Sequence, residues 1–144
     1  MEPSSMEFNV VIPDGVEEIE DRAFSDFAIQ LGVKIMSVSI PDSVTKIGAE
    51  AFRSSWLSEV TIPDSVVSIG DSAFQGCFIL TTVTIGSGIE KIGQLAFADC
   101  DRLKEIVFRG KTEDEVKHLP MVHHEDAMYP WGIQHPKSVI KCEP

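Results

Sequence analysis

Hydrophobic and polar positions follow one frame that recurs along this chain of 144 residues. Apolar residues at Leu57, Val60 and Ile62 are separated by polar ones, so the end of the frame alternates with a period of two. Successive side chains of a strand point to opposite faces, and the alternation therefore predicts a short β-strand with one buried face. The same frame recurs at residues 35–40, 80–85 and 103–108.

Each predicted strand leads into a turn. The strands that end at Ile12, Ile40 and Ile62 are followed by Pro-Asp-Gly or Pro-Asp-Ser, and proline has no backbone N–H with which to continue a paired strand. A V-x-x-I-G segment then supplies two more interior apolar residues, and its glycine predicts a second bend with positive φ at Gly48, Gly70 and Gly93. The Ala-Phe pair that closes each unit, such as Ala73-Phe74, predicts a small and a large core residue on a short helical segment.

The strand, the turns and the Ala-Phe pair form one unit that is repeated. The leading residues of successive units are 28, 22, 23 and 23 positions apart. A unit of this length cannot close a core of its own, so the units must stack and bury their apolar columns against one another. The expected fold is therefore a solenoid. The units begin at Val10, Val38, Val60 and Val83, and a fifth begins at Ile106 and stops after its strand.

The units resemble the BspA-type leucine-rich repeats, whose pattern IP-x-x-V-x-x-I-G-x-x-A-F-x-x-C-x-x-L-x-x-V-x-I matches residues 10–108. The resemblance implies an α/β solenoid, a right-handed leucine-rich-repeat superhelix with short parallel strands and short helical or irregular connections. It also implies a noncatalytic role in binding or adhesion, usually in bacterial surface or secreted proteins. The first unit departs from the pattern, with Glu20 in place of Gly and a longer connection before Ile35 that we expect to be more helical. The fourth unit replaces Pro-Asp by Gly86-Ser87.

The end of the repeats divides the chain into a repeat array at residues 1–108 and a C-terminal capping segment at 109–144. A solenoid exposes the apolar face of its last unit unless another segment covers it. Thr112 and Glu115 form a capping-box pattern that predicts a short helix, and residues 138–142 predict a final strand. The apolar residues expected to cover the last unit are Leu119, Met121, Tyr129, Trp131, Ile133, Val139 and Ile140.

The N-terminal end of the array has no comparable cover. Few polar residues precede the first strand, too few to cover Val10, Ile12, Val16 and Ile19. We therefore expect this end either to associate with a second copy of the chain or to be continued by residues upstream. A structural spacer or self-assembling repeat unit is accordingly the alternative to a binding module.

The net charge of the chain limits the classes of partner that it can bind. It has 12 basic and 23 acidic side chains, a net charge of -11. This charge repels phosphate backbones and anionic lipids, so we expect neither nucleic acid nor an anionic membrane as a partner. We also expect no membrane insertion, because no apolar run reaches the length of a membrane span, and no basic and apolar leader opens the chain. The resemblance suggests a secreted or cell-surface protein, whereas a complete chain without a leader would be cytoplasmic.

No sequence pattern for catalysis or cofactor binding is found. The motifs G-x-S-x-G, the P-loop and the Rossmann glycine fingerprint are absent, and we expect no catalytic residue and no cofactor. One cluster has metal-ligand residue types without the spacing of a zinc site, and we interpret it as polar surface of the cap rather than as a metal site. Its members are His118, His123, His124, Glu125, Asp126 and His135.

Two further sets of residues share a position in successive units. Asp14, Asp42 and Asp64 occupy one turn position, where a cation would relieve their mutual repulsion. We prefer the interpretation that each aspartate bonds its own turn. Cys77 and Cys100 also share a register, and we expect them to be buried, neighbouring thiols.

The remaining candidate for function is the outer face of the strands. Residues between the buried positions point outward, and stacking arranges them in two ladders on the predicted sheet. Hydroxyl-rich side chains on a flat sheet can form hydrogen bonds to a protein or surface ligand, and leucine-rich repeats generally bind on this face. Simple solvation of strand-favouring threonines is the alternative. The ladders begin with Asn9 and Val11, and the candidate binding residues are Ser37, Ser39, Glu59, Thr61, Thr82, Thr84, Glu105 and Val107.

Overall fold

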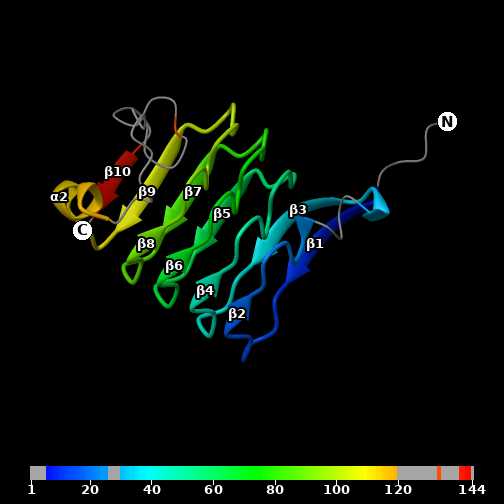
Figure 1. Ribbon diagram of the computed structural model, residues 1–144, viewed down its shortest axis with the longest axis horizontal. Coiled ribbons are helices and arrows are strands. Elements are labelled where there is room, and N and C mark those ends of the chain that lie inside the picture. The colour runs from blue at the N-terminus through cyan, green and yellow to red at the C-terminus, as the bar shows by residue number, and fades with distance from the viewer. Residues whose placement is uncertain (1–5, 26–29, 120–132, 134–139, 144) are drawn as a thin grey trace.

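The computed structural model describes residues 6–25, 30–119, 133 and 140–143. Successive coils of the chain lie side by side, and each of the first four coils contributes one strand to each of two rows (Figure 1). The first row contains β1 (Glu7–Val11), β3 (Lys34–Ser39), β5 (Glu59–Ile62), β7 (Thr82–Ile85), β9 (Glu105–Arg109) and β10 (Ile140–Glu143). The second row contains β2 (Glu18–Ile19), β4 (Lys46–Ile47), β6 (Ser68–Ile69) and β8 (Lys91–Ile92).

All described strand pairs are parallel, and their register follows the repeat. Val60 pairs with Val83, and Val83 pairs with Ile106. The frame of apolar residues therefore predicted the first row correctly. The second row was not predicted, because its strands have only two residues each and are too short to show an alternating pattern. The parallel strands of these stacked coils form a solenoid-like repeat fold.

The core consists of columns that run across the coils. Phenylalanine rings stack on the rings of the next unit, with centroids 5.1, 5.4 and 5.5 Å apart and planes 5–10° apart. Offset stacking of aromatic rings at this separation is favourable beyond the apolar area that it buries. The predicted inward positions of the complete coils, such as Leu57, Val60 and Ile62, are buried in the same core. The stacked column is Phe24, Phe52, Phe74 and Phe97.

The prediction of positive φ at Gly48, Gly70 and Gly93 is wrong. A Cβ atom at these positions would lie 2.4–2.5 Å from a backbone nitrogen of the preceding coil, so glycine is required there by close approach. The left-handed conformation occurs two residues later, at Glu50, Ser72 and Leu95.

The Ala-Phe pairs also differ from the sequence-based expectation. Residues 49–54, 71–76 and 94–99 form hydrogen-bonded turns rather than short helices. In these segments two residues have positive φ: the one before the Ala-Phe pair and the second one after it. Ser72 and Gly76 are examples, on either side of Ala73-Phe74. Right-handed helical backbone is interrupted at such residues, which explains why no helix forms. Of the first unit's longer connection, residues 26–29 lie outside the described part of the chain.

The C-terminal segment begins as predicted. The short helix α2 (Glu113–Lys117) starts at Thr112, whose hydroxyl accepts a hydrogen bond of 3.2 Å from the backbone N–H of Glu115. Strand β10 pairs with β9, and Leu119 and Ile133 are buried in the core. The expected cap residues 121, 129, 131 and 139 lie outside the described residues.

The N-terminal end is more closed than the sequence indicated. Ile12 and Ile19 are 6% and 4% exposed, whereas Val10 and Val16 are half-buried. An apolar hollow of about 440 Å³ remains at this end, lined among others by Val10, Val16 and Phe24. Within the described residues, no helix has both the length and the apolar character needed to cross a membrane.

Candidate functional site

The predicted outward positions form lateral pairs on the first row of strands. Glu59 lies beside Thr82 and Thr61 beside Thr84 in the parallel ladder of β5 and β7. On β3 the hydroxyl of Ser37 donates a hydrogen bond of 2.8 Å to Oδ1 of Asn9 on β1. The side chains of Ser37, Ser39, Glu59 and Thr61 are exposed, and those of Thr82 and Thr84 are half-buried.

Two members of the predicted binding set are not free at the C-terminal end of the row. Val107 is only 7% exposed, so the expectation that it points into open solvent is wrong. Strand β9 is flanked by β7 and β10, and the last strand closes the ladder beside Val107. Glu105 accepts a hydrogen bond of 2.7 Å from the ammonium of Lys141 on β10, and this contact raises the pKa of Lys141. The candidate face therefore centres on β3, β5 and β7.

The first row is not one continuous sheet. β1 and β3 form one sheet, and β5, β7, β9 and β10 form another, so no ladder joins β3 to β5 in the described structure. The sequence predicted uninterrupted ladders from the first coil to the last, because the repeat frame is the same on both sides of this junction. We call the opening between residues 38–42 and residues 59–64 the β3–β5 gap.

The β3–β5 gap is closed at both ends. At the start of the strands, the backbone N–H of Trp56 donates to the carbonyl of Ile35 at 3.0 Å. The ammonium of Lys34 lies 4.3 Å from the centre of the Trp56 ring, a cation–π contact. Beyond the strands, the hydroxyl of Ser65 donates to the carbonyl of Val44 at 2.7 Å. These ties hold the two coils together on either side of an opening of fixed extent.

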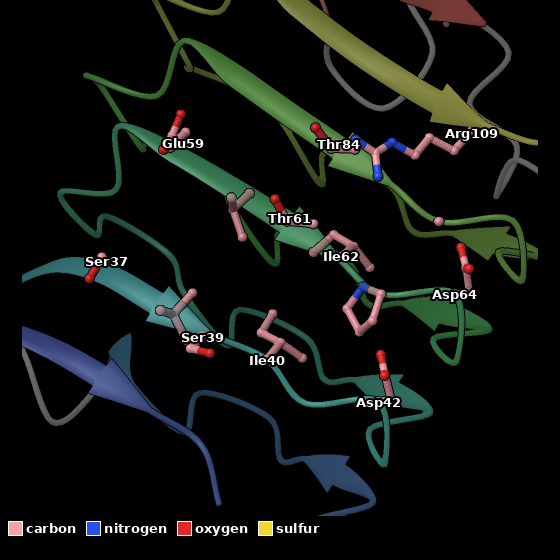
Figure 2. A pocket seen from close by; sticks show the side chains of 14 residues that line it. Ser37, Ser39, Ile40, Asp42, Glu59, Thr61, Ile62, Asp64, Thr84 and Arg109 are labelled. Carbon is pink, nitrogen blue, oxygen red and sulfur yellow. The ribbon is translucent and has the colours of Figure 1, made fainter. Parts of the chain in front are cut away.

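A pocket of about 510 Å³ lies at the gap. Figure 2 shows Ser39 and Asp42 on one side and Thr61 and Asp64 on the other, with Arg109 reaching toward the opening from β9. Apolar side chains of both coils contribute to its lining together with these polar groups. Five of the predicted binding residues therefore surround a hollow rather than a flat sheet: Ser37, Ser39, Glu59, Thr61 and, from the next strand, Thr84.

The turn at Asp64 is tied to the next coil. Oδ1 of Asp64 accepts a hydrogen bond of 2.8 Å from the backbone N–H of Ser87, in the next coil rather than in its own turn. A second aspartate column, which sequence reasoning missed, does the same: Asp21 accepts from Ala49 N–H and Asp71 from Gln94 N–H, both at 2.8 Å. The signal was available, because both aspartates follow the glycine position of the unit.

Among the described residues, no three potential metal ligands gather into a site, and the cluster at 123–135 lies outside them.

The cysteines form a column of small polar groups in the core. The thiol of Cys77 lies 3.2 Å from the hydroxyl of Ser55, which holds the same register in the second unit. Cys77 and Cys100 are hydrogen-bonded neighbours, which confirms their predicted adjacency; Cys77 is buried and Cys100 is half-buried. Each thiol donates to a carbonyl of the preceding coil, Phe52 at 3.4 Å and Phe74 at 3.2 Å. The hydrogen bond to Cys77 and then burial raise the pKa of the Cys100 thiol.

Parallel strands in stacked coils, with a polar outer face and a columnar core, define a leucine-rich-repeat type of protein. The family model of the BspA type leucine rich repeat region matches residues 29–117 in six copies. The chain belongs to this family.

A crystal structure of a leucine-rich repeat protein from Bacteroides ovatus ATCC 8483 is similar in fold, with a TM-score of 0.68 and 24% sequence identity. The similarity covers 96% of this chain and 30% of that protein. The chain thus spans less than a third of the length of this structural relative. No curated protein matches the chain.

Proposed function

We propose that this chain is a noncatalytic protein-binding or adhesion module, and that its partner binds on the outer face of β3, β5 and β7. The observation that carries the proposal is the division of side chains on these strands. Val60 and Ile62 are buried, while Glu59 and Thr61, which alternate with them, are exposed. Polar groups that a core holds in fixed lateral pairs lose little conformational freedom on binding, and this preorganisation favours affinity.

Membership in the repeat family and the pocket at the β3–β5 gap support the same conclusion. Concave sites are common places for recognition, because they bury more of a ligand than a flat surface does. The net charge of -11 favours cationic partner surfaces, since complementary charges steer association.

The proposal is tested with a double variant, Thr61→Lys with Thr84→Lys. We expect the fold to persist, since both side chains lie on the outer face. We expect the double variant to bind more weakly to its partner, identified by screening the unaltered chain against a panel of purified extracellular and surface proteins. Val67→Lys is the matched control, because Val67 is exposed beside the second row and far along the coil from the proposed face. Biolayer interferometry measures binding, and circular dichroism checks the fold. Unchanged binding by the double variant would move the site to another surface.

The alternative function is a spacer or self-assembling unit that associates through its N-terminal end. The apolar hollow lined by Val10, Val16 and Phe24 favours it. The acidic residues Glu18 and Glu20 line the same hollow and oppose the approach of an identical surface, which weighs against two copies meeting there. Light scattering decides this alternative: it requires a stable oligomer that dissociates when Val10 is replaced by Asp.

A further inference from the structure

We propose that the β3–β5 gap binds the arginine or lysine side chain of an extended partner segment. This inference rests on the proposed function, for which it names the site and the chemistry of the partner. Three observations carry it: an unfilled backbone acceptor, an excess of carboxylates, and a hollow that is held open by the coils themselves.

The gap contains a carbonyl for which the fold supplies no donor. In the next coil, the equivalent carbonyl of Ile62 accepts a hydrogen bond of 2.8 Å from the backbone N–H of Gly86. For Ile40, the residue at the donor position is Pro63, which has no N–H. Among the described residues, no hydrogen bond reaches the backbone oxygen or nitrogen of Ile40. An unpaired carbonyl in a half-buried residue favours a ligand that donates hydrogen bonds.

Proline alone does not open the sheet. Pro41 stands at the same place between the first two coils, where β1 and β3 nevertheless form a ladder. The open junction between β3 and β5 is thus not caused by proline. Pro63 only removes one backbone hydrogen-bond donor at this junction. Because no ladder joins β3 to β5, the backbone edges of these strands at Val38 and Thr61 also lack ladder partners across the gap.

The charges around the gap favour a cation. Asp42, Glu59 and Asp64 line the pocket against one cationic side chain, Arg109. Within the described residues, none of the three carboxylates takes part in an ion pair. Oδ1 of Asp64 is occupied by the N–H of Ser87. A guanidinium carries five donors, and an ammonium three, which suits carboxylates and carbonyls that converge from two coils.

The form of the gap selects a side chain rather than a whole strand. The ties at Trp56 and Ser65 prevent the two coils from separating enough to admit another strand between them. A ligand must therefore approach from the outer face and insert a side chain. Val38 and Ile40 are half-buried, so they can cover the aliphatic stem of lysine or arginine while the cationic end reaches the polar groups.

The test uses the peptide acetyl-Ser-Val-Arg-Val-Ser-amide with isotopically labelled protein, followed by changes in backbone amide shifts. We expect saturable shifts at Val38, Ile40 and Thr61 that weaken as salt is added. The same peptide with citrulline in place of arginine keeps the shape and loses the charge. We expect its affinity to be lower by a factor of roughly five or more.

Variants of the protein separate the contributions. Asp42→Asn and Glu59→Gln should each weaken binding roughly two- to fivefold. Asp14→Asn is the matched control, because Asp14 holds the same turn position in the first coil and lies outside the pocket. Pro63→Ala supplies the missing N–H without changing charge, and it should weaken binding roughly tenfold if the Ile40 carbonyl takes part.

Three results would overturn the inference: no saturable shift at millimolar peptide, equal affinity for the citrulline peptide, or shifts confined to β7 and β9. Loss of affinity in Asp14→Asn as large as in Asp42→Asn would also overturn it. The broader proposal, that a protein partner binds the outer face, is tested separately. A protein partner that is lost with Thr61→Lys and Thr84→Lys, yet retained with Asp42→Asn and Glu59→Gln, would leave the face in place and remove only the cation site.

Discussion

The rings of Phe52 and Phe74 stack with their centroids 5.4 Å apart and their planes 10° apart. Phe74 stacks in the same way on Phe97, so each central ring fills the space between two coils. We expect Phe74→Ala to lower the free energy of unfolding by about 3–5 kcal/mol, since it removes a fully buried aromatic from a column with no side chain to replace it. Urea denaturation measures the loss. Phe78→Ala is the control: Phe78 is 53% exposed, and a change within about 0.5 kcal/mol is expected. Equal losses for the two variants would contradict a stacked core.

Gly70→Ala should be among the most damaging single changes in the array. An added Cβ would lie 2.4 Å from the backbone nitrogen of Ala49 and 2.6 Å from the carbonyl carbon of Gly48, and backbone cannot rotate away as a side chain can. We expect a loss of at least about 3 kcal/mol, or no folded protein, by circular dichroism and urea denaturation. Gly15→Ala is the control, because no atom lies within 4 Å of its added Cβ and only the φ of +98° opposes it. If Gly15→Ala were the more harmful change, conformational freedom rather than close approach would explain the glycines.

Ser54→Gly should stabilise the protein. Ser54 has a φ of 59°, and its side chain is exposed; Gly76 holds the equivalent position in the next unit with a φ of 74°. The left-handed conformation costs a non-glycine residue about 1–2 kcal/mol, of which the greater freedom of glycine in the unfolded chain offsets a part. A net gain of about 0.5–1 kcal/mol is expected by urea denaturation. Ser58→Gly, at an exposed position without positive φ, should destabilise, and a gain there would show that the effect is not conformational.

Stability should decline at alkaline pH because of Cys100. Its hydrogen bond to Cys77 and its burial raise the pKa of the folded thiol above the value of about 8.5 expected in the unfolded chain. Below that pH both states keep the proton and no penalty arises. Above it the unfolded state releases the proton while the folded state retains it, so the free energy of unfolding falls as pH rises.

The measurement compares urea denaturation under reducing conditions at pH 7.5 and at pH 10. Burial also raises the pKa of Cys142, and the hydrogen bond to Cys100 lowers the pKa of Cys77, so both proteins carry Cys142→Ser and Cys77→Ser; burial still raises the pKa of Cys100 in this background. Within this background, Cys100→Ser should show a smaller loss between the two pH values, by up to about 1.36 kcal/mol for each pH unit above about 8.5 in which the folded Cys100 thiol keeps its proton. Serine is suited to the position because Ser55 occupies the same register in the second unit. Identical pH dependence with and without Cys100 would contradict the assignment.

The repeat frame predicted the first row of strands because period-two alternation and the Pro-Asp turns act within a few residues. Val60 and Ile62 are buried, and the turn follows at Pro63 and Asp64, as that frame requires. The role of Gly70 was misjudged for the opposite reason. A sequence pattern shows that glycine is needed at a position, but both positive φ and contact with another coil produce the same requirement, and only the position of Ala49 distinguishes them.

The candidate site was predicted in part. Ser39, Glu59 and Thr61 lie on the outer face as expected, whereas Val107 is buried and Glu105 is held by Lys141. These two exceptions arise at the last strand, where β10 returns from a distant part of the sequence to pair with β9. A ladder inferred from the repeats alone has no information about such a neighbour.

The sequence by itself determined the repeat unit, the residues that face the core, and membership in a stacked-coil family, because these follow from local periodicity and from the inability of one short unit to bury its own apolar face. Only the tertiary structure decided where neighbouring coils pair and where they do not. Ladder hydrogen bonds depend on the separation of two backbones, and units with nearly the same frame form a ladder between β5 and β7 but leave the β3–β5 gap open. The most specific candidate for recognition in this protein lies at that junction, where the repetition of the sequence is not matched by repetition of the hydrogen bonds.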